Sequence, residues 1–241
     1  MPSVPRGFIC EDSSISFKYE GDTIPVSWVI ISGLMPLLLV SILKFNSYSI
    51  RILNKFSLFQ MWITEFIFYD EQQEDFDAKL QFKTSWRRTL HWFKSYGISL
   101  VILLLVMDVI KVLIGEPRPH FLDSCRPDTA LNCTKGSFVP TFTCLNKDVS
   151  NYTLRDSSRS FPSGHACLSV YSALFMIWFL QIRVPKLQTI FLIPFIQTIC
   201  MIWVSICSVS RITDHRHHWW DVLGGLFLGI LSAFFCVSLI F

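Results

Sequence analysis

Charged residues are scarce in this chain of 241 residues. Only 16% of the residues are Asp, Glu, Lys or Arg, whereas an ordinary soluble domain carries about 25%. The chain is instead 51% hydrophobic, with 22 Phe and 8 Trp, which excludes disordered and collagen-like proteins. The net charge of +3 is too small to indicate a nucleic acid as partner. We therefore predict a polytopic membrane protein with an all-α fold.

Apolar runs of about 20 residues, the length that crosses a bilayer as a helix, recur along the chain. Five such runs predict membrane spans: 26–43, 92–114, 165–182, 187–209 and 222–241. The segment 56–69 is apolar but short and contains Gln60 and Glu65, so we expect an interfacial or protein-packed helix there. No internal repeat is present, and residues 1–241 are treated as one membrane-embedded helical bundle.

Basic residues indicate the orientation, because short loops rich in Lys and Arg stay on the cytoplasmic side. The segment 44–91 between the first two predicted spans is rich in both, so we predict that it is cytoplasmic. The loop 115–164 is then extracellular or luminal. It carries two N-glycosylation sequons, at Asn132 and Asn151, which support this orientation. The N-terminal segment is polar and does not resemble a signal peptide.

The eight cysteines fall into two groups. Four lie in predicted outside segments, where disulfides persist: Cys10, Cys125, Cys133 and Cys144. Four thiols allow three pairings, and the sequence does not choose among them. The other four lie in predicted helices, where we expect small apolar packing residues: Cys167, Cys200, Cys207 and Cys236.

A pair of cations ends the second predicted span. Lys111 lies near the end of this helix and Arg118 follows just beyond it. A point-like ammonium and a forked guanidinium can therefore both reach one anion. The alternative is snorkelling, in which both side chains only reach for lipid headgroups.

The turn Pro162-Ser163-Gly164 leads directly into the third predicted span. The first N–H groups of a helix have no intrahelical partner and lie at its positive end, so Ser163 and Gly164 predict an anion site. His165, in the first turn, is placed to act as an acid or base beside that anion. The alternative is an ordinary serine cap followed by an interfacial histidine.

The loop between the last two predicted spans is rich in histidine and arginine. If the helix begins near His217, Asp221 lies four residues on and can orient the imidazole, as in an activated nucleophilic histidine. Two alternatives are a charged turn at the membrane surface and a metal site that adds His215 and His218. The arginines repel a metal cation. If Arg118, Arg211, Arg216 and Lys111 lie in one neighbourhood, they favour an anion.

In order and spacing, the three clusters resemble the signature of the phosphatidic acid phosphatase type 2 and haloperoxidase superfamily. Further segments are similar to the animal lipid phosphate phosphatases: Arg6-Gly7-Phe8, Cys10, Asp22-Thr23-Ile24-Pro25, and Arg118 to Asp123 with Cys125. The motif Phe161-Pro162-Ser163-Gly164-His165 and the long loop 115–164 resemble those of an insect-type, wunen-like member. The resemblance covers most of the chain.

The resemblance implies a role for each matching residue. Five would hold the phosphate oxygens: Lys111, Arg118, Ser163, Gly164 and Arg211. His217 would attack phosphorus, Asp221 would orient it, and His165 would protonate the leaving alkoxide and later act on water. No metal ion or other cofactor is implied, because the cationic groups take the place of magnesium. His215 and His218 have no role in this scheme and are assigned to the surface.

Because the clusters lie at the ends of predicted spans, a phosphate can enter at headgroup level while its acyl chains remain in the bilayer. The resemblance narrows the substrates to phosphatidate, lysophosphatidate, sphingosine 1-phosphate and ceramide 1-phosphate, at the extracellular or luminal face of the plasma membrane or an endomembrane. Two alternatives are a phosphatase for soluble esters, similar to the glucose-6-phosphatase branch, and a non-catalytic membrane binding or adhesion relative.

The sequence departs from the family in two places. The family has six spans, and the first looks absent here, so we expect a truncated product. The alternative is a rearranged topology in which 56–69 spans the membrane. The acidic segment 70–77 lengthens the cytoplasmic loop and is interpreted as a solvated charge run. Gly225 and Gly229 form a small-residue face that can pack another helix or, in a homo-oligomer, a second subunit. We favour packing within the chain.

Overall fold

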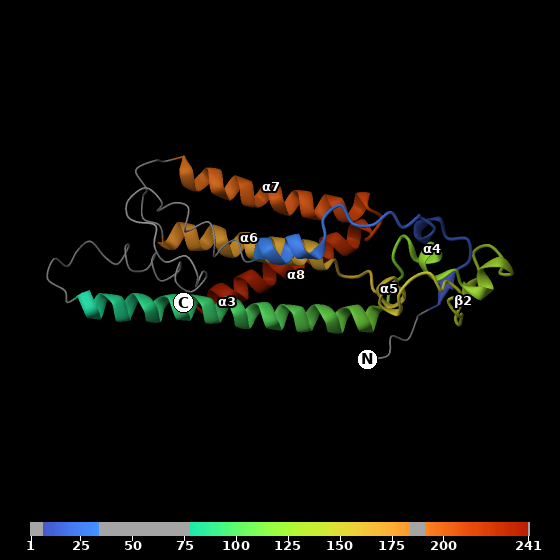
Figure 1. Ribbon diagram of the computed structural model, residues 1–241, viewed down its shortest axis with the longest axis horizontal. Coiled ribbons are helices and arrows are strands. Elements are labelled where there is room, and N and C mark those ends of the chain that lie inside the picture. Colours follow the sequence, from blue (N-terminus) through green and yellow to red (C-terminus); the bar gives the residue numbers. More distant parts are fainter. Residues whose placement is uncertain (1–6, 34–77, 184–190, 241) are drawn as a thin grey trace. The chain divides into compact units, whose positions relative to one another are not determined.

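The computed structural model describes residues 7–33, 78–183 and 191–240. Its long helices are α3 (Ala78–Ile114), α6 (Gly164–Arg183), α7 (Leu192–Thr213) and α8 (Trp219–Ser238), labelled in Figure 1. The shorter elements are β1 (Phe8–Ile9), η1 (Ser13–Ile15), α4 (Phe121–Cys125), η2 (Asp128–Leu131), β2 (Phe138–Val139) and α5 (Asn151–Asp156). The described chain is mostly helical, which confirms the predicted fold class.

Four helices of the described residues are long and apolar enough to cross a membrane: Leu90–Ile114, Gly164–Ile182, Ile193–Thr213 and Trp219–Ser238. They match the last four predicted spans to within a few residues at most ends, and the protein is a polytopic helical membrane protein. Of the predicted span 26–43, only 26–33 is described, and it is helical. The segments 56–69, 70–77 and 184–190 lie outside the described residues.

Helix α3 begins well before its apolar part. It starts at Ala78, so the end of the predicted cytoplasmic loop 44–91 continues the helix rather than forming a loop. The residues 78–91 are rich in Ala, Lys, Leu, Gln and Arg, all strong helix formers, which explains the extension. Within the apolar part, side chains such as Val101, Leu105 and Leu113 are exposed, as expected of a helix that contacts lipid.

The chain divides into two compact units. One comprises the described parts of Met1–Pro25, Leu104–Cys167 and Ser205–Leu228, and the other comprises those of Val26–Leu103, Leu168–Val204 and Gly229–Phe241. The first unit contains every residue predicted for the site.

Aromatic and hydroxyl side chains form the interior of the second unit. The Tyr96 ring stacks on Tyr171 with centroids 5.1 Å apart, and Trp92 packs edge-on against Phe179 at 5.4 Å. The Tyr96 hydroxyl donates to the Gly33 carbonyl oxygen at 2.8 Å. The buried Tyr96 hydroxyl is thus paired, as burial in an apolar environment favours.

Two disulfides lie within the first unit, one between the N-terminal segment and the loop 115–164 and one inside that loop. They join Cys10 to Cys133 and Cys125 to Cys144, which selects one of the three pairings left open by the sequence. Strand β1 pairs antiparallel with β2, with Phe8 opposite Val139. The Cys10–Cys133 disulfide and the β1–β2 pair therefore hold the N-terminal segment against the loop 115–164. Residues of this segment can thus contribute to the site.

Candidate active site

The predicted turn at the start of α6 lies against the end of α3. A Cβ built on Gly164 would be 4.0 Å from Lys111 Nζ and 3.5 Å from Met107 Sδ. The half-buried Lys111 ammonium therefore lies beside the first residue of α6. This brings the first predicted cluster, at the end of α3, next to the second.

The same turn lies against the start of α8. The Ser163 N–H donates to the Asp221 carbonyl oxygen at 2.9 Å, and the Ser160 hydroxyl donates to Asp221 Oδ2. A Cβ on Gly225 would lie only 2.4 Å from the Ser163 carbonyl oxygen. Glycine is therefore required there by close approach, and this predicted small-residue position packs against the Ser163 turn of its own chain.

His165 and Arg211 connect α6 with the end of α7. His165 Nε2 lies 3.2 Å from the Ile24 carbonyl oxygen and 3.4 Å from Arg211 Nη1. Arg211 is buried and also donates to Ile24, through Nη2, at 3.2 Å. All three predicted clusters thus meet in one unit, together with the segment that precedes residue 26.

His217 is buried, and its Nδ1 lies 3.5 Å from Asp221 Oδ2 and 3.4 Å from the Ser160 hydroxyl oxygen. Burial lowers the pKa of His217 well below its ordinary value, and the charges of Arg118 and Lys111 act in the same direction. The imidazole is therefore neutral at physiological pH. With Nδ1–H directed at Asp221, the lone pair lies on Nε2.

The spacing between His217 and Asp221 arises from a helix cap. The sequence predicted a helix beginning near His217, whereas α8 begins at Trp219. The Asp221 carboxylate accepts from the His218 backbone N–H at 2.8 Å, so it closes the turn before the helix and holds His217 at the same time.

Arg118 is buried in the loop after α3, and its Nη2 donates to Asp156 Oδ1 at 2.7 Å. Burial lowers the pKa of Arg118 to about 10, and the Asp156 charge opposes this shift, so the guanidinium is charged at neutral pH. Arg118 Nε and the Ser163 hydroxyl are among the buried polar groups of the described residues that have no hydrogen-bond partner; Asp221 Oδ1 is another. Buried donors are usually paired, and an anion would satisfy the first two of these groups.

The two remaining histidines of the third cluster have other partners. The His218 ring donates to the Pro117 carbonyl oxygen at 3.3 Å and stacks on Trp220 with centroids 4.5 Å apart. His215 adopts a positive φ of 52° and packs edge-on against Phe17. Both are partly exposed, and among the interactions of the described residues neither imidazole contacts His217 or Asp221; His218 contacts Asp221 through its backbone only.

Several residues of the site were not among the predicted site residues, although Arg216 was one of the cations from which an anion was inferred. The carboxylates of Asp22 and Asp156 accept from the arginines, Arg216 contacts both, and Ser160 donates to Asp221. In the sequence, only the neighbours of these residues along the chain otherwise indicated a link to the site. Arg216 adjoins His217, and Asp22 belongs to a segment similar to the lipid phosphate phosphatases.

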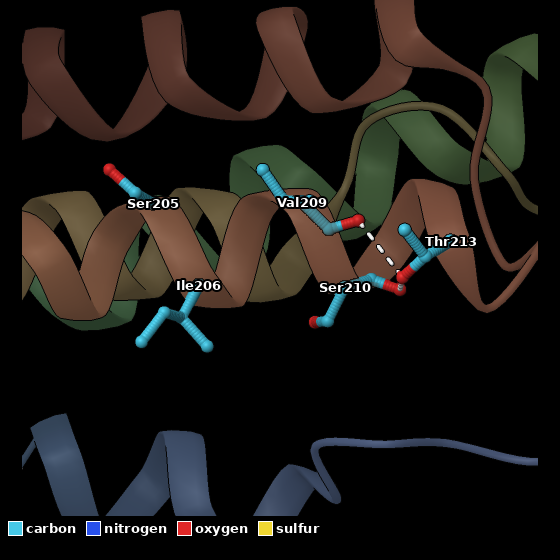
Figure 2. A pocket seen from close by; sticks show the side chains of 5 residues that line it. All are labelled: Ser205, Ile206, Val209, Ser210 and Thr213. Atoms are coloured by element: carbon cyan, nitrogen blue, oxygen red, sulfur yellow. Dashed lines mark hydrogen bonds between the residues drawn. The ribbon is translucent and has the colours of Figure 1, made fainter.

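A cavity of about 390 Å³ lies on one face of α7, next to the turn that carries Arg211. Its lining residues are Ser205, Ile206, Val209, Ser210 and Thr213 (Figure 2). The lining includes no charged side chain, so this cavity supplies no cation to a phosphate. The cationic cluster, and not the cavity, is the candidate active site.

Glu116 adjoins the cluster, and its ionisation is expected to make folding stability depend on pH. Its Oε1 accepts from the Trp220 indole N–H at 2.7 Å. Burial raises the pKa of Glu116 to about 7, with the Trp220 hydrogen bond opposing and the Asp221 charge adding to the shift. In the folded state Glu116 keeps its proton up to about pH 7, whereas in the unfolded state it loses the proton at lower pH. The free energy of unfolding therefore falls as the pH rises toward 7.

We expect Glu116→Gln to raise the thermal unfolding midpoint relative to the wild type at about pH 8, where the carboxylate is ionised, but not at about pH 5. The measurement is thermal unfolding of the solubilised chain at both pH values. Glu20→Gln is the matched control, because Glu20 is exposed in the same unit and should change neither midpoint. An equal shift at both pH values would contradict the assignment.

Comparison with known proteins identifies similar sequences. The model of the PAP2 superfamily matches residues 92–241. The "Phospholipid phosphatase homolog 1.2 homolog" of Caenorhabditis elegans is 30% identical over 92% of this chain and 61% of that protein. The "Putative phosphatidate phosphatase" of Drosophila melanogaster is 27% identical, over 95% of this chain and 59% of that protein. "Phospholipid phosphatase 1" of Rattus norvegicus is 29% identical, over 96% and 74%.

The chain thus spans about three fifths of the length of the first two relatives. No solved structure matches it.

Proposed function

This chain belongs to the PAP2 superfamily, and we propose that it is a membrane phosphatase that hydrolyses the phosphomonoester of phosphorylated lipids. The observation that carries the proposal is the buried cationic cluster within one unit. Lys111 and Arg211 lie beside the first residues of α6, and the Arg118 charge acts on Lys111, His165 and His217. Arg118 Nε and the Ser163 hydroxyl are buried donors without a partner in the described chain. The relatives named as phospholipid and phosphatidate phosphatases support a lipid phosphate as the anion.

In the proposed mechanism, the phosphate oxygens accept from Lys111, Arg118, Arg211, the Ser163 hydroxyl and the N–H groups at the start of α6. These donors are fixed before the substrate arrives. They stabilise the charge that develops on the equatorial oxygens in the transition state, which is the main contribution a protein makes to phosphoryl transfer.

His217 attacks phosphorus through Nε2 in the first step. The P–N bond forms as the ester P–O bond breaks, and His165 gives a proton to the leaving alkoxide. Asp221 and Ser160 hold Nδ1 and favour positive charge on the imidazole as the bond forms. Water then attacks the phosphohistidine, His165 accepts the water proton, and cleavage of the P–N bond releases phosphate and free His217.

The substrate class follows from the position of the cluster. Lys111 and Arg211 lie in the last turns of α3 and α7, and Gly164 begins α6, so a bound phosphate lies at the end of three candidate spans. Acyl chains can stay in lipid at that depth. We propose phosphatidate, lysophosphatidate, sphingosine 1-phosphate and ceramide 1-phosphate as substrates.

We also propose that the site faces the exterior or the lumen, in the plasma membrane or an endomembrane. Asn132 and Asn151 are both exposed in the same unit as the cluster, which supports glycosylation of that side. The disulfides Cys10–Cys133 and Cys125–Cys144 support an oxidising compartment.

The test of the proposal is phosphate release from phosphatidate vesicles in the presence of a chelator. We expect the rate to stay within about twofold of the rate without chelator, because the protein cations perform the role of magnesium. Glycerol 3-phosphate serves as the soluble control and should be hydrolysed far more slowly. Loss of activity in chelator, restored by magnesium, would contradict metal independence. Equal rates on the soluble ester would favour a phosphatase for soluble esters.

A further inference from the structure

Charged side chains around the site alternate in sign along one continuous chain of contacts. Asp156 accepts from Arg118 at 2.7 Å through Oδ1 and from Arg216 at 3.1 Å through Oδ2. Asp22 Oδ1 in turn lies 3.0 Å from Arg216 Nε and accepts from Arg211 at 2.8 Å. The order is therefore Arg118, Asp156, Arg216, Asp22, Arg211, and we call these five residues the ion network.

The ion network joins segments that are remote in sequence. Arg118 follows α3, and Asp156 ends α5. Arg211 lies in the last turn of α7, and Arg216 lies between α7 and α8. Asp22 comes from the N-terminal segment, which the Cys10–Cys133 disulfide fixes to the loop 115–164. The two end members are the arginines proposed to bind phosphate, and the three other side chains link them.

One end of the network, Arg211, and its middle member, Arg216, make further contacts. Arg211 Nη2 donates to Asp214 Oδ2 at 3.0 Å, and the Thr23 N–H donates to the same oxygen at 2.8 Å. Arg216 Nη1 donates to His120 Nε2 at 2.9 Å, and burial lowers the pKa of His120 to about 3, so that the ring is a neutral acceptor. Arg216 also lies 5.1 Å from the centre of the Tyr19 ring.

Side chains in the network are largely shielded from solvent. The exposed fraction is 1% for Arg211, 5% for Arg118 and 11% for Arg216, and the two carboxylates are 20% and 24% exposed. Three arginines buried to this extent repel one another, and removal of one partner from a buried ion pair leaves an uncompensated charge. The two carboxylates therefore offset the repulsion among the three guanidinium groups.

We propose that Asp22, Asp156 and Arg216 are positioning residues, which hold Arg118 and Arg211 at the separation that the transition state of phosphoryl transfer requires. The inference rests on the proposed function. None of the three needs to touch the phosphate. Arg216 bridges the two carboxylates with different nitrogens of one planar guanidinium, a geometry that lysine does not reproduce.

The variant Asp22→Asn distinguishes a role in positioning the arginines from a role in binding the phosphate. Loss of its negative charge makes the surroundings of Arg211 more positive, so the affinity for a ground-state phosphate should be unchanged or higher. The arginines, however, lose the group that holds them, and misplacement of catalytic groups by about 1 Å costs about a hundredfold in rate. We therefore expect kcat to fall by about tenfold to a hundredfold while KM is unchanged or lower.

The experiment measures kcat and KM on phosphatidate for the wild type, Asp22→Asn, Arg216→Lys and Arg216→Gln in the full chain. Asp148→Asn is the control, because Asp148 pairs with Arg126 at 3.7 Å in the same unit but is 84% exposed. Arg216→Lys should recover only part of the activity lost in Arg216→Gln. For Asp22→Asn, a kcat within about twofold of the wild type, a rise in kcat, or a parallel rise in KM would contradict positioning.

Binding of orthovanadate, which can adopt the five-coordinate geometry of the transition state, provides a measure independent of turnover. Asp22→Asn should weaken orthovanadate binding by about tenfold and leave the binding of inorganic phosphate unchanged or tighter. A wild-type chain that binds both anions but releases no phosphate from lipids would contradict the proposed function alone. Equal effects on both anions would contradict the positioning role alone.

Discussion

His217→Ala lowers phosphate release from phosphatidate by at least about a thousandfold, whereas His218→Ala stays within a few-fold of the wild type. This is the expected result because the two adjacent imidazoles have different surroundings. His217 is buried beside Asp221 and Ser160, and its pKa is lowered, so the neutral nitrogen is available as a nucleophile. His218 is directed at the Pro117 carbonyl and the Trp220 ring.

The pair is its own control, since the same substitution is made at neighbouring positions. The measurement is the initial rate of phosphate release, with thermal unfolding of both variants to show that each is folded. Equal activity in the two variants would overturn the assignment of His217 as the nucleophile.

Gly225→Ala has the second largest expected effect. The added Cβ would lie 2.4 Å from the Ser163 carbonyl oxygen, a separation that real Cβ atoms do not adopt, so the turn or α8 must shift. That turn carries Ser163, Gly164 and His165. A shift of about 1 Å in groups that bind the transition state is expected to lower kcat about a hundredfold.

Gly97→Ala is the matched control. Gly97 also lies within a helix, α3, but a Cβ there meets no atom within 4 Å. Alanine is favoured over glycine in a helix by about 0.5–1 kcal/mol, so this variant should be at least as stable as the wild type and equally active. If Gly225→Ala retains the kcat of Gly97→Ala, close packing of α8 on the Ser163 turn is not important for catalysis.

The parts of the fold that could be predicted from the sequence depend on local patterns. Apolar length alone located α3, α6, α7 and α8, because a bilayer dictates the length of a span. The pairing of His217 with Asp221 could also be predicted, since four residues of chain bring the two together in a single turn.

The features that could not be predicted depend on contacts between remote segments. The disulfide Cys10–Cys133 joins residues separated by 123 positions, and no local pattern encodes that choice. Asp156 carries no signal in the sequence and Asp22 only its place in a segment similar to the family, and only the fold brings both to Arg216. A carboxylate next to a proposed phosphate site also contradicts the simple expectation of a purely cationic pocket, which is why neither was predicted.

The most direct test of the account is whether phosphate becomes covalently attached to His217. Turnover of phosphatidate with a radiolabelled phosphate would be stopped rapidly without acid, and the chain digested and mapped. The account predicts label on the peptide that contains His217 in the wild type and no label in His217→Ala. Label on another residue, or rapid turnover with no labelled histidine at any quench time, would contradict it.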